Sequence, residues 1–98
     1  MAYRLSRKAE EDILHIYLAG AGEFGADQAE RYHVGLERAL AFLSDFPHAA
    51  PVRPELGPAS RIHPYKSHII IYRLDGQDIL VQRVRHALED WANQGRLP

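Results

Sequence analysis

Residues 68–86 read HIIIYRLDGQDILVQRVRH, and this stretch decides the fold. Its two halves are rich in β-branched residues and flank the dipeptide Asp75-Gly76, which strongly favours a two-residue β-hairpin turn. A turn at those two residues places Tyr72 opposite Ile79, because the turn sets the register of a hairpin. Both faces are then apolar in the middle, so the sequence predicts an antiparallel hairpin that is at least partly covered on both sides.

Two helices are predicted before this hairpin. Ser6 is a good helix N-cap, and acidic residues follow it in the first turns, where the helix dipole favours negative charge. Apolar residues recur at steps of three and four over residues 9–20 and again over 29–43, which indicates two amphipathic helices. Only a few residues around Gly25 separate them, so we expect an antiparallel helical hairpin. Residues 3–5 alternate and predict a short strand before the first helix.

The remaining segments complete the expected architecture. Residues 47–58 hold four prolines and a glycine, which predicts a surface loop. Residues 61–65 are extended, and Pro64 places them at a sheet edge or a bulge. Residues 88–93 carry Trp91 and predict a short C-terminal helix. The order predicts an α+β fold, with an N-terminal strand and an antiparallel helical hairpin packed on a mostly antiparallel sheet.

Composition excludes several classes of protein. The 98 residues suit a single domain spanning 1–98. The absence of cysteine excludes disulfides, thiolate nucleophiles and cysteine-bound metals, and it fits a reducing compartment. The net charge of −1 lacks the broad positive field of proteins that grip nucleic acid. The densest apolar run, residues 69–72, is too short to span a membrane. We therefore expect a cytoplasmic protein without direct sequence-specific DNA binding.

Several local patterns have structural explanations. The six histidines show no HExxH or HxxxH spacing, so we expect no metal and no other cofactor. The acidic run at residues 10–12 is explained by a solvated helix start rather than by acid–base chemistry. Tyr17, Tyr32 and Phe46 stand at helical spacings and are expected to pack in the core rather than to form a base-stacking platform.

Taken in order along the chain, a set of short motifs resembles the ParE branch of the ParE/RelE superfamily of bacterial toxins. Each motif alone is weak, but their order and spacing together are fairly specific. The motifs are Tyr3-Arg4-Leu5-Ser6, Ala9-Glu10-Glu11-Asp12, Phe24-Gly25, Gln28-Ala29-Glu30-Arg31-Tyr32, Arg53-Pro54-Glu55-Leu56-Gly57 with Arg61, Ser67-His68-Ile69-Ile70-Ile71-Tyr72-Arg73, Arg83-Val84-Arg85-His86, and Asp90-Trp91.

The resemblance implies a cytoplasmic toxin of a type II toxin–antitoxin module. A cognate ParD-like antitoxin, encoded beside it, would neutralise the toxin by wrapping a C-terminal segment around it. ParE-like members act on DNA gyrase, whereas RelE-like members are ribosome-dependent endoribonucleases that cut messenger RNA. A non-toxic relative that keeps only antitoxin binding is a third possibility.

The basic residues help to choose between these targets. Metal-free RNA cleavage needs a base, an acid and cations around one phosphate, and RelE-like members supply these from a dense basic set on the sheet. Here Ile69 and Ile71 occupy matching positions and cannot do that work. The interpretation as an inhibitor of gyrase that is not an enzyme is therefore favoured. The ribonuclease alternative requires Arg61, Arg83 and His86 to converge around a phosphate-sized space.

Two candidate surfaces follow from these arguments. The residues expected to act on the target are Arg61, Arg83, His86 and Trp91. His86 could also be a packing histidine at the sheet edge, and the predicted register puts it on the same sheet face as Ile71. The antitoxin is expected to cover the helical hairpin and an exposed sheet face at Ile69, Ile71 and Leu80.

Overall fold

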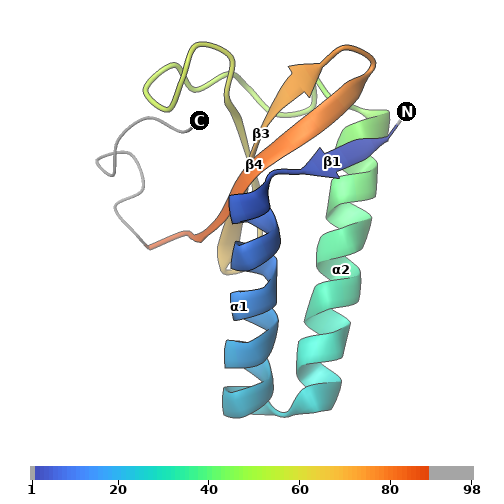
Figure 1. Ribbon diagram of the computed structural model, residues 1–98, viewed down its shortest axis with the longest axis vertical. Helices are drawn as coiled ribbons and strands as arrows, with labels where there is room; N and C mark the ends of the chain where they lie inside the picture. The colour runs from blue at the N-terminus through green and yellow to red at the C-terminus, as the bar shows by residue number, and fades with distance from the viewer. Residues whose placement is uncertain (1, 89–98) are drawn as a thin grey trace.

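The computed structural model describes residues 2–88, and it shows two helices and a four-stranded sheet (Figure 1). The predicted α+β class and the predicted order of elements are confirmed, whereas the expected C-terminal helix around Trp91 lies outside the described residues. The elements are β1 (Tyr3–Leu5), α1 (Arg7–Phe24), α2 (Ala26–Asp45), β2 (Arg61–Tyr65), β3 (His68–Asp75) and β4 (Asp78–His86).

The strands lie in the order β1-β4-β3-β2. β1 pairs with β4 in parallel, and the other two pairings are antiparallel, as predicted for a mostly antiparallel sheet. β2 is an edge strand, which agrees with the prediction from Pro64, because a proline cannot donate a hydrogen bond to an interior ladder. The helices lie side by side and extend past the end of the sheet (Figure 1).

The turn between β3 and β4 differs from the prediction. Asp75 pairs with Asp78, so the two turn residues are Gly76 and Gln77 rather than Asp75 and Gly76. Gly76 has a φ of +64°, and neither neighbour has a positive φ. This arrangement matches a two-residue hairpin turn with glycine at its first central position. The predicted turn, with Asp75 and Gly76 as its central residues, would need a positive φ at both of these residues. The register therefore moves, and Tyr72 faces Val81.

A β-bulge in β4 changes the register a second time. Ile71 pairs with Arg83 while Tyr72 pairs with Val81, so Gln82 is an extra residue in β4. The Gln82 carbonyl accepts a hydrogen bond of 2.7 Å from the Ser6 hydroxyl. A bulge reverses the alternation of side chains beyond it.

The bulge therefore corrects the predicted position of His86. His86 pairs with His68, and Val84 pairs with Ile70 and joins the core against the helices. His86 lies on this helical face and not on the face of Ile71, where the predicted register placed it.

The sheet is covered on both faces, as predicted. One core lies between the helices and the sheet and includes Leu36, Leu40, Leu43, Ile70, Tyr72, Ile79, Val81 and Val84. A smaller core on the opposite face packs Leu56 of the loop against Ile62, Ile69 and Ile71. Ile69 and Ile71 are only 7% and 1% exposed, so the expected open apolar sheet face is absent there, because the proline-rich loop covers it.

Phe46 is a second departure from the predicted core. Tyr17 and Tyr32 are partly buried, but Phe46 is 59% exposed. α2 ends at Asp45, so Phe46 is its C-cap, and its backbone no longer follows the helical angles that the spacing assumed. Its side chain lies at the surface beside Phe42.

A single residue joins the two helices. The start of α1, at the other end of this helix, is capped by Ser6, which accepts a hydrogen bond of 3.0 Å from the Ala9 N–H. Gly25 ends α1 and begins α2 with φ +94° and ψ 160°, a backbone conformation that side chains with a Cβ rarely adopt. The sharp joint of the helical hairpin therefore depends on this glycine.

We expect Gly25→Ala to lower the free energy of unfolding by about 1–2 kcal/mol, because alanine at this φ is strained. Gly22→Ala is the matched control, since Gly22 lies within α1 with nothing within 4 Å of the position of an added Cβ. The control should raise stability by up to about 1 kcal/mol through helix propensity. Urea unfolding measures both values, and equal effects of the two variants would contradict the role of Gly25.

Candidate functional site

Arg83 is held by a carboxylate from the first turns of α1. Its Nε lies 2.7 Å from Asp12 Oδ2, and its Nη2 lies 3.0 Å from Oδ1. The Val84 N–H also donates to Asp12 Oδ2 at 3.0 Å. The two side chains are only 17% and 14% exposed. A bidentate pair at this depth is a strong, directional contact. It uses the Arg83 guanidinium to join β4 to α1.

Arg61 lies in β2, the strand at the opposite edge of the sheet from β1. Its Nη1 donates a hydrogen bond of 2.6 Å to the carbonyl of Ala50. Tyr72, the partner of Arg61 across the β2–β3 pairing, donates from its hydroxyl to the carbonyl of Pro47 at 2.8 Å. Together these contacts fasten the start of the proline-rich loop to the sheet.

His86 belongs to a third group of side chains, at the end of β4. Its ring lies 5.3 Å from the ring of His68, edge to face, and Tyr32 Oη lies 2.6 Å from His68 Nδ1. The Leu88 N–H donates to His86 Nδ1, so that nitrogen is an acceptor. Burial raises the pKa of Tyr32, which keeps its hydroxyl protonated at neutral pH.

The three predicted target residues within the described part of the chain therefore do not converge. Arg83 binds Asp12, Arg61 binds the loop, and His86 contacts His68. Trp91, the fourth predicted residue, lies outside the described residues. Sequence reasoning missed Asp12, which it assigned to the solvated start of the helix, because no local signal connects it with an arginine 71 residues later.

A groove lies between the helical hairpin and the near end of the sheet. Its volume is about 580 Å³, and we call it the hairpin groove. Its apolar wall includes Ile13, Ile16, Phe24, Ala29 and Leu36, and its polar end includes Tyr32, Ser67, His68 and His86.

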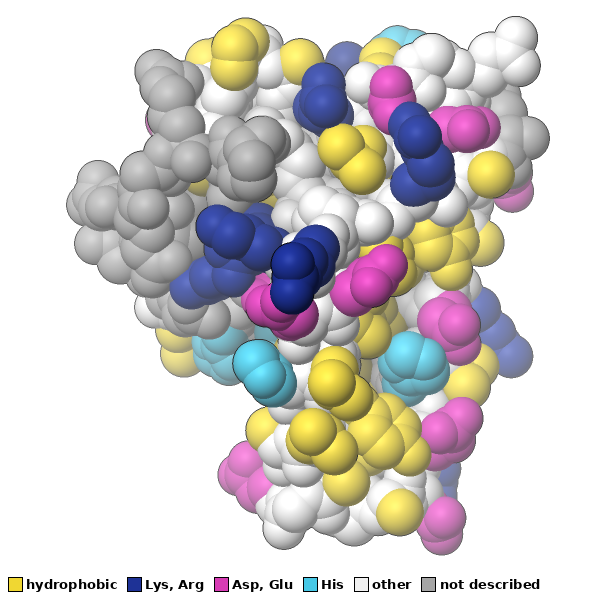
Figure 2. Space-filling model, viewed as in Figure 1, with side chains coloured by type: hydrophobic (Ala, Val, Ile, Leu, Met, Phe, Trp, Pro, Cys, Tyr) yellow, Lys and Arg dark blue, Asp and Glu magenta, His cyan; other side chains and the backbone are white. Residues whose placement is uncertain are grey.

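The other side of the hairpin exposes an apolar strip. Leu14 and Leu18 of α1 are 55% and 57% exposed, and hydrophobic side chains gather on this part of the surface (Figure 2). Tyr17 lies beside them, and its hydroxyl hydrogen-bonds to Glu30 Oε2 at 3.3 Å. The negative charge of Glu30 raises the pKa of Tyr17. An apolar strip with acidic neighbours is suited to a partner that brings both apolar and basic side chains.

Residues 2–88 lack two further features. No group of three or more histidine and carboxylate side chains there is placed to hold a metal ion. Neither helix of that region is apolar enough over sufficient length to cross a membrane.

The fold is shared with a bacterial toxin–antitoxin protein. The solved structure described as the chromosomal ParDE TA system from P. aeruginosa contains a chain with 20% sequence identity and a TM-score of 0.76. The match covers 88% of this chain and 95% of that one, so the architecture is common to both. No match was found among the curated proteins.

The family itself is shown by sequence. The family model described as the ParE toxin of type II toxin-antitoxin system, parDE, matches residues 3–91, which is nearly the whole chain. The chain belongs to the ParE toxin family of type II toxin–antitoxin systems, as the ordered motifs indicated.

Removing the Asp12 carboxylate should destabilise the fold. We expect Asp12→Ala to cost about 3 kcal/mol of unfolding free energy, because it leaves the mostly buried Arg83 guanidinium without its partner. Glu11→Ala is the control, since Glu11 forms an exposed pair with Arg7 at 3.6 Å that is worth about 0.5 kcal/mol or less. Chemical unfolding compares the two. An Asp12→Ala loss no larger than that of the control would be inconsistent with this clamp.

Proposed function

We propose that this toxin inhibits DNA gyrase without being an enzyme and that a ParD-like antitoxin neutralises it. The observation that carries the proposal is the match to the ParE family over residues 3–91. Gyrase is the target that resemblance to the ParE branch implies, and the resemblance also implies an antitoxin encoded beside the toxin. Both partners would be met in the cytoplasm.

The arrangement of the basic residues supports a target other than the ribosome. RNA cleavage would need cations, a base and an acid around a single phosphate. The guanidinium of Arg83 is neutralised by Asp12, and that of Arg61 is used on the loop. The His86 ring lies beside that of His68, and its Nδ1 accepts a hydrogen bond from the Leu88 N–H. A ribonuclease mechanism therefore receives no support from this geometry.

The antitoxin surface that we propose is centred on the helical hairpin. Ile69 and Ile71 are covered by the loop, so of the predicted sheet residues only Leu80 keeps partial exposure. Leu14 and Leu18 of the apolar strip are exposed, and the surface around Leu14 also includes Tyr17 of α1 and Glu30 of α2. An amphipathic segment laid on the hairpin would bury these side chains, as in helix-in-groove recognition.

A supercoiling assay with purified gyrase tests the target. The protein should abolish plasmid supercoiling or trap cleaved plasmid, and the cognate antitoxin should reverse the effect. His86→Ala should weaken inhibition about tenfold while keeping the fold, because His86 lies at a groove rather than in the core. His48→Ala, at an exposed position in the loop, is the matched control. Folded protein that arrests growth yet leaves gyrase unaffected, with new 5′ ends on transcripts, would favour the ribonuclease alternative.

A second variant tests the antitoxin surface. Leu18→Glu places a charge in the apolar strip, so we expect antitoxin affinity to fall at least about tenfold while gyrase inhibition is kept. Val52→Glu is the control, because Val52 is also an exposed apolar residue, at 38%, but lies in the loop before β2. Titration calorimetry measures both affinities, and unchanged binding by Leu18→Glu would place the antitoxin elsewhere.

A further inference from the structure

Aromatic rings form an exposed cluster at the C-terminal end of α2. Phe42 and Phe46 are 44% and 59% exposed, and their ring centroids are 5.2 Å apart. The His63 ring of β2 lies 5.8 Å from Phe42 on its other side. Burial lowers the pKa of His63, so this ring is neutral at pH 7. We call Phe42, Phe46 and His63 the aromatic patch.

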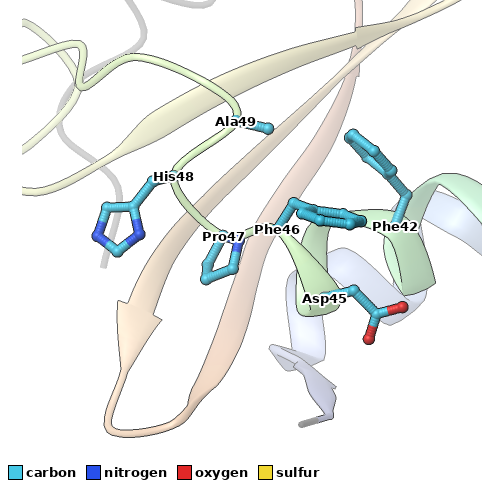
Figure 3. A pocket seen from close by; sticks show the side chains of 6 residues that line it. All are labelled: Phe42, Asp45, Phe46, Pro47, His48 and Ala49. Carbon is cyan, nitrogen blue, oxygen red and sulfur yellow. The ribbon is translucent and has the colours of Figure 1, made fainter.

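The aromatic patch borders a shallow hollow. This hollow has a volume of about 460 Å³ and an almost wholly apolar lining, and the side chains around it come from the end of α2 and the start of the loop (Figure 3). Exposed rings beside an apolar hollow are costly to leave in water. The rings can insert into a partner, and the hollow can receive an apolar side chain from that partner.

Opposite charges stand on the two sides of Phe42 along α2. Arg38 is one turn before Phe42 and Asp45 is about one turn after it, so the three residues share one helix face. Arg38 and Asp45 are both exposed, and within the described part of the chain neither has an ion pair or hydrogen bond.

This order of charges is complementary to itself. A twofold axis that crosses α2 midway between Arg38 and Asp45 passes within one residue of Phe42. When two α2 helices pack antiparallel about this axis, each Arg38 faces the Asp45 of the other copy, and the two Phe42 rings meet at the centre. A twofold interface makes every such contact twice. A partner whose charges were all of one sign would be complementary to Arg38 or to Asp45 but not to both.

We propose that the aromatic patch and its flanking charges bind a second copy of this chain, through antiparallel packing of the two α2 helices. The patch is small, so the dimer is a weak one that forms at micromolar concentrations. It uses the side of α2 that contacts β2 through Phe42 and His63. The apolar strip lies on α1, so a copy paired through α2 in this way keeps that strip open.

Analytical ultracentrifugation of the full-length toxin between about 1 and 100 μM tests the pairing. The sedimenting mass should rise from monomer to dimer over this range. Arg38→Glu or Asp45→Arg alone should weaken the dimer at least about tenfold, because each places two like-charge contacts across the axis. The double variant Arg38→Glu/Asp45→Arg reverses both partners and should restore wild-type affinity. Arg31→Glu, two turns before Arg38 on the same face, should have little effect.

Crosslinking gives an independent measurement that does not depend on the charge variants. The chain has no cysteine, so Ala41→Cys places a single thiol at the axis, and Ala26→Cys places one at the far end of α2. Mild oxidation should produce covalent dimers of Ala41→Cys much faster than of Ala26→Cys. Monomer at every concentration, a double variant as weak as the single ones, or equal crosslinking of the two thiols would overturn the proposal. These results do not depend on gyrase inhibition.

Discussion

The carboxylate of Asp12 ties the helical hairpin to the sheet. It accepts hydrogen bonds from the Arg83 guanidinium and the Val84 N–H. These contacts join α1 to the part of β4 that follows residues 79–81, where the pairing with β1 ends. β4 in turn lies between β1 and β3 and carries the residues that meet the helices. Charged groups at this depth are stable only when paired, so this bidentate contact adds a directional constraint to the apolar core that packs the hairpin on the sheet.

Local chemistry was enough to predict much of this architecture. Ser6 and Gly25 mark the helix ends, the apolar spacing gives the helical faces, and Pro64 identifies the edge strand. Long-range pairings were not predictable in the same way. At the bulge, the carbonyl of Gln82 accepts a hydrogen bond from Ser6 and its side-chain oxygen accepts one from Ser60. No pattern within the sequence of β4 predicts these contacts.

The same limit explains why the candidate site was only partly predicted. The motifs identified the family correctly, but two of their arginines make separate structural contacts. Arg61 binds the loop, and Arg83 binds α1. Arg61 and Arg83 were selected because of their position in motifs, and position alone cannot distinguish a residue that binds a target from one that holds a loop or a helix. Their contacts with Ala50 and Asp12 become visible only when distant segments are brought together.

The parallel pairing of β1 with β4 has a consequence for synthesis. Ser6 donates to the Gln82 carbonyl, a contact between residues 76 apart, and the Ala2 N–H reaches Asp78 over the same separation. The helical hairpin consists of neighbouring residues and can form early, whereas β1 can join the sheet only after β4 has left the ribosome. In a nascent chain, β1 therefore has no partner strand until residues 79–81 of β4 have emerged.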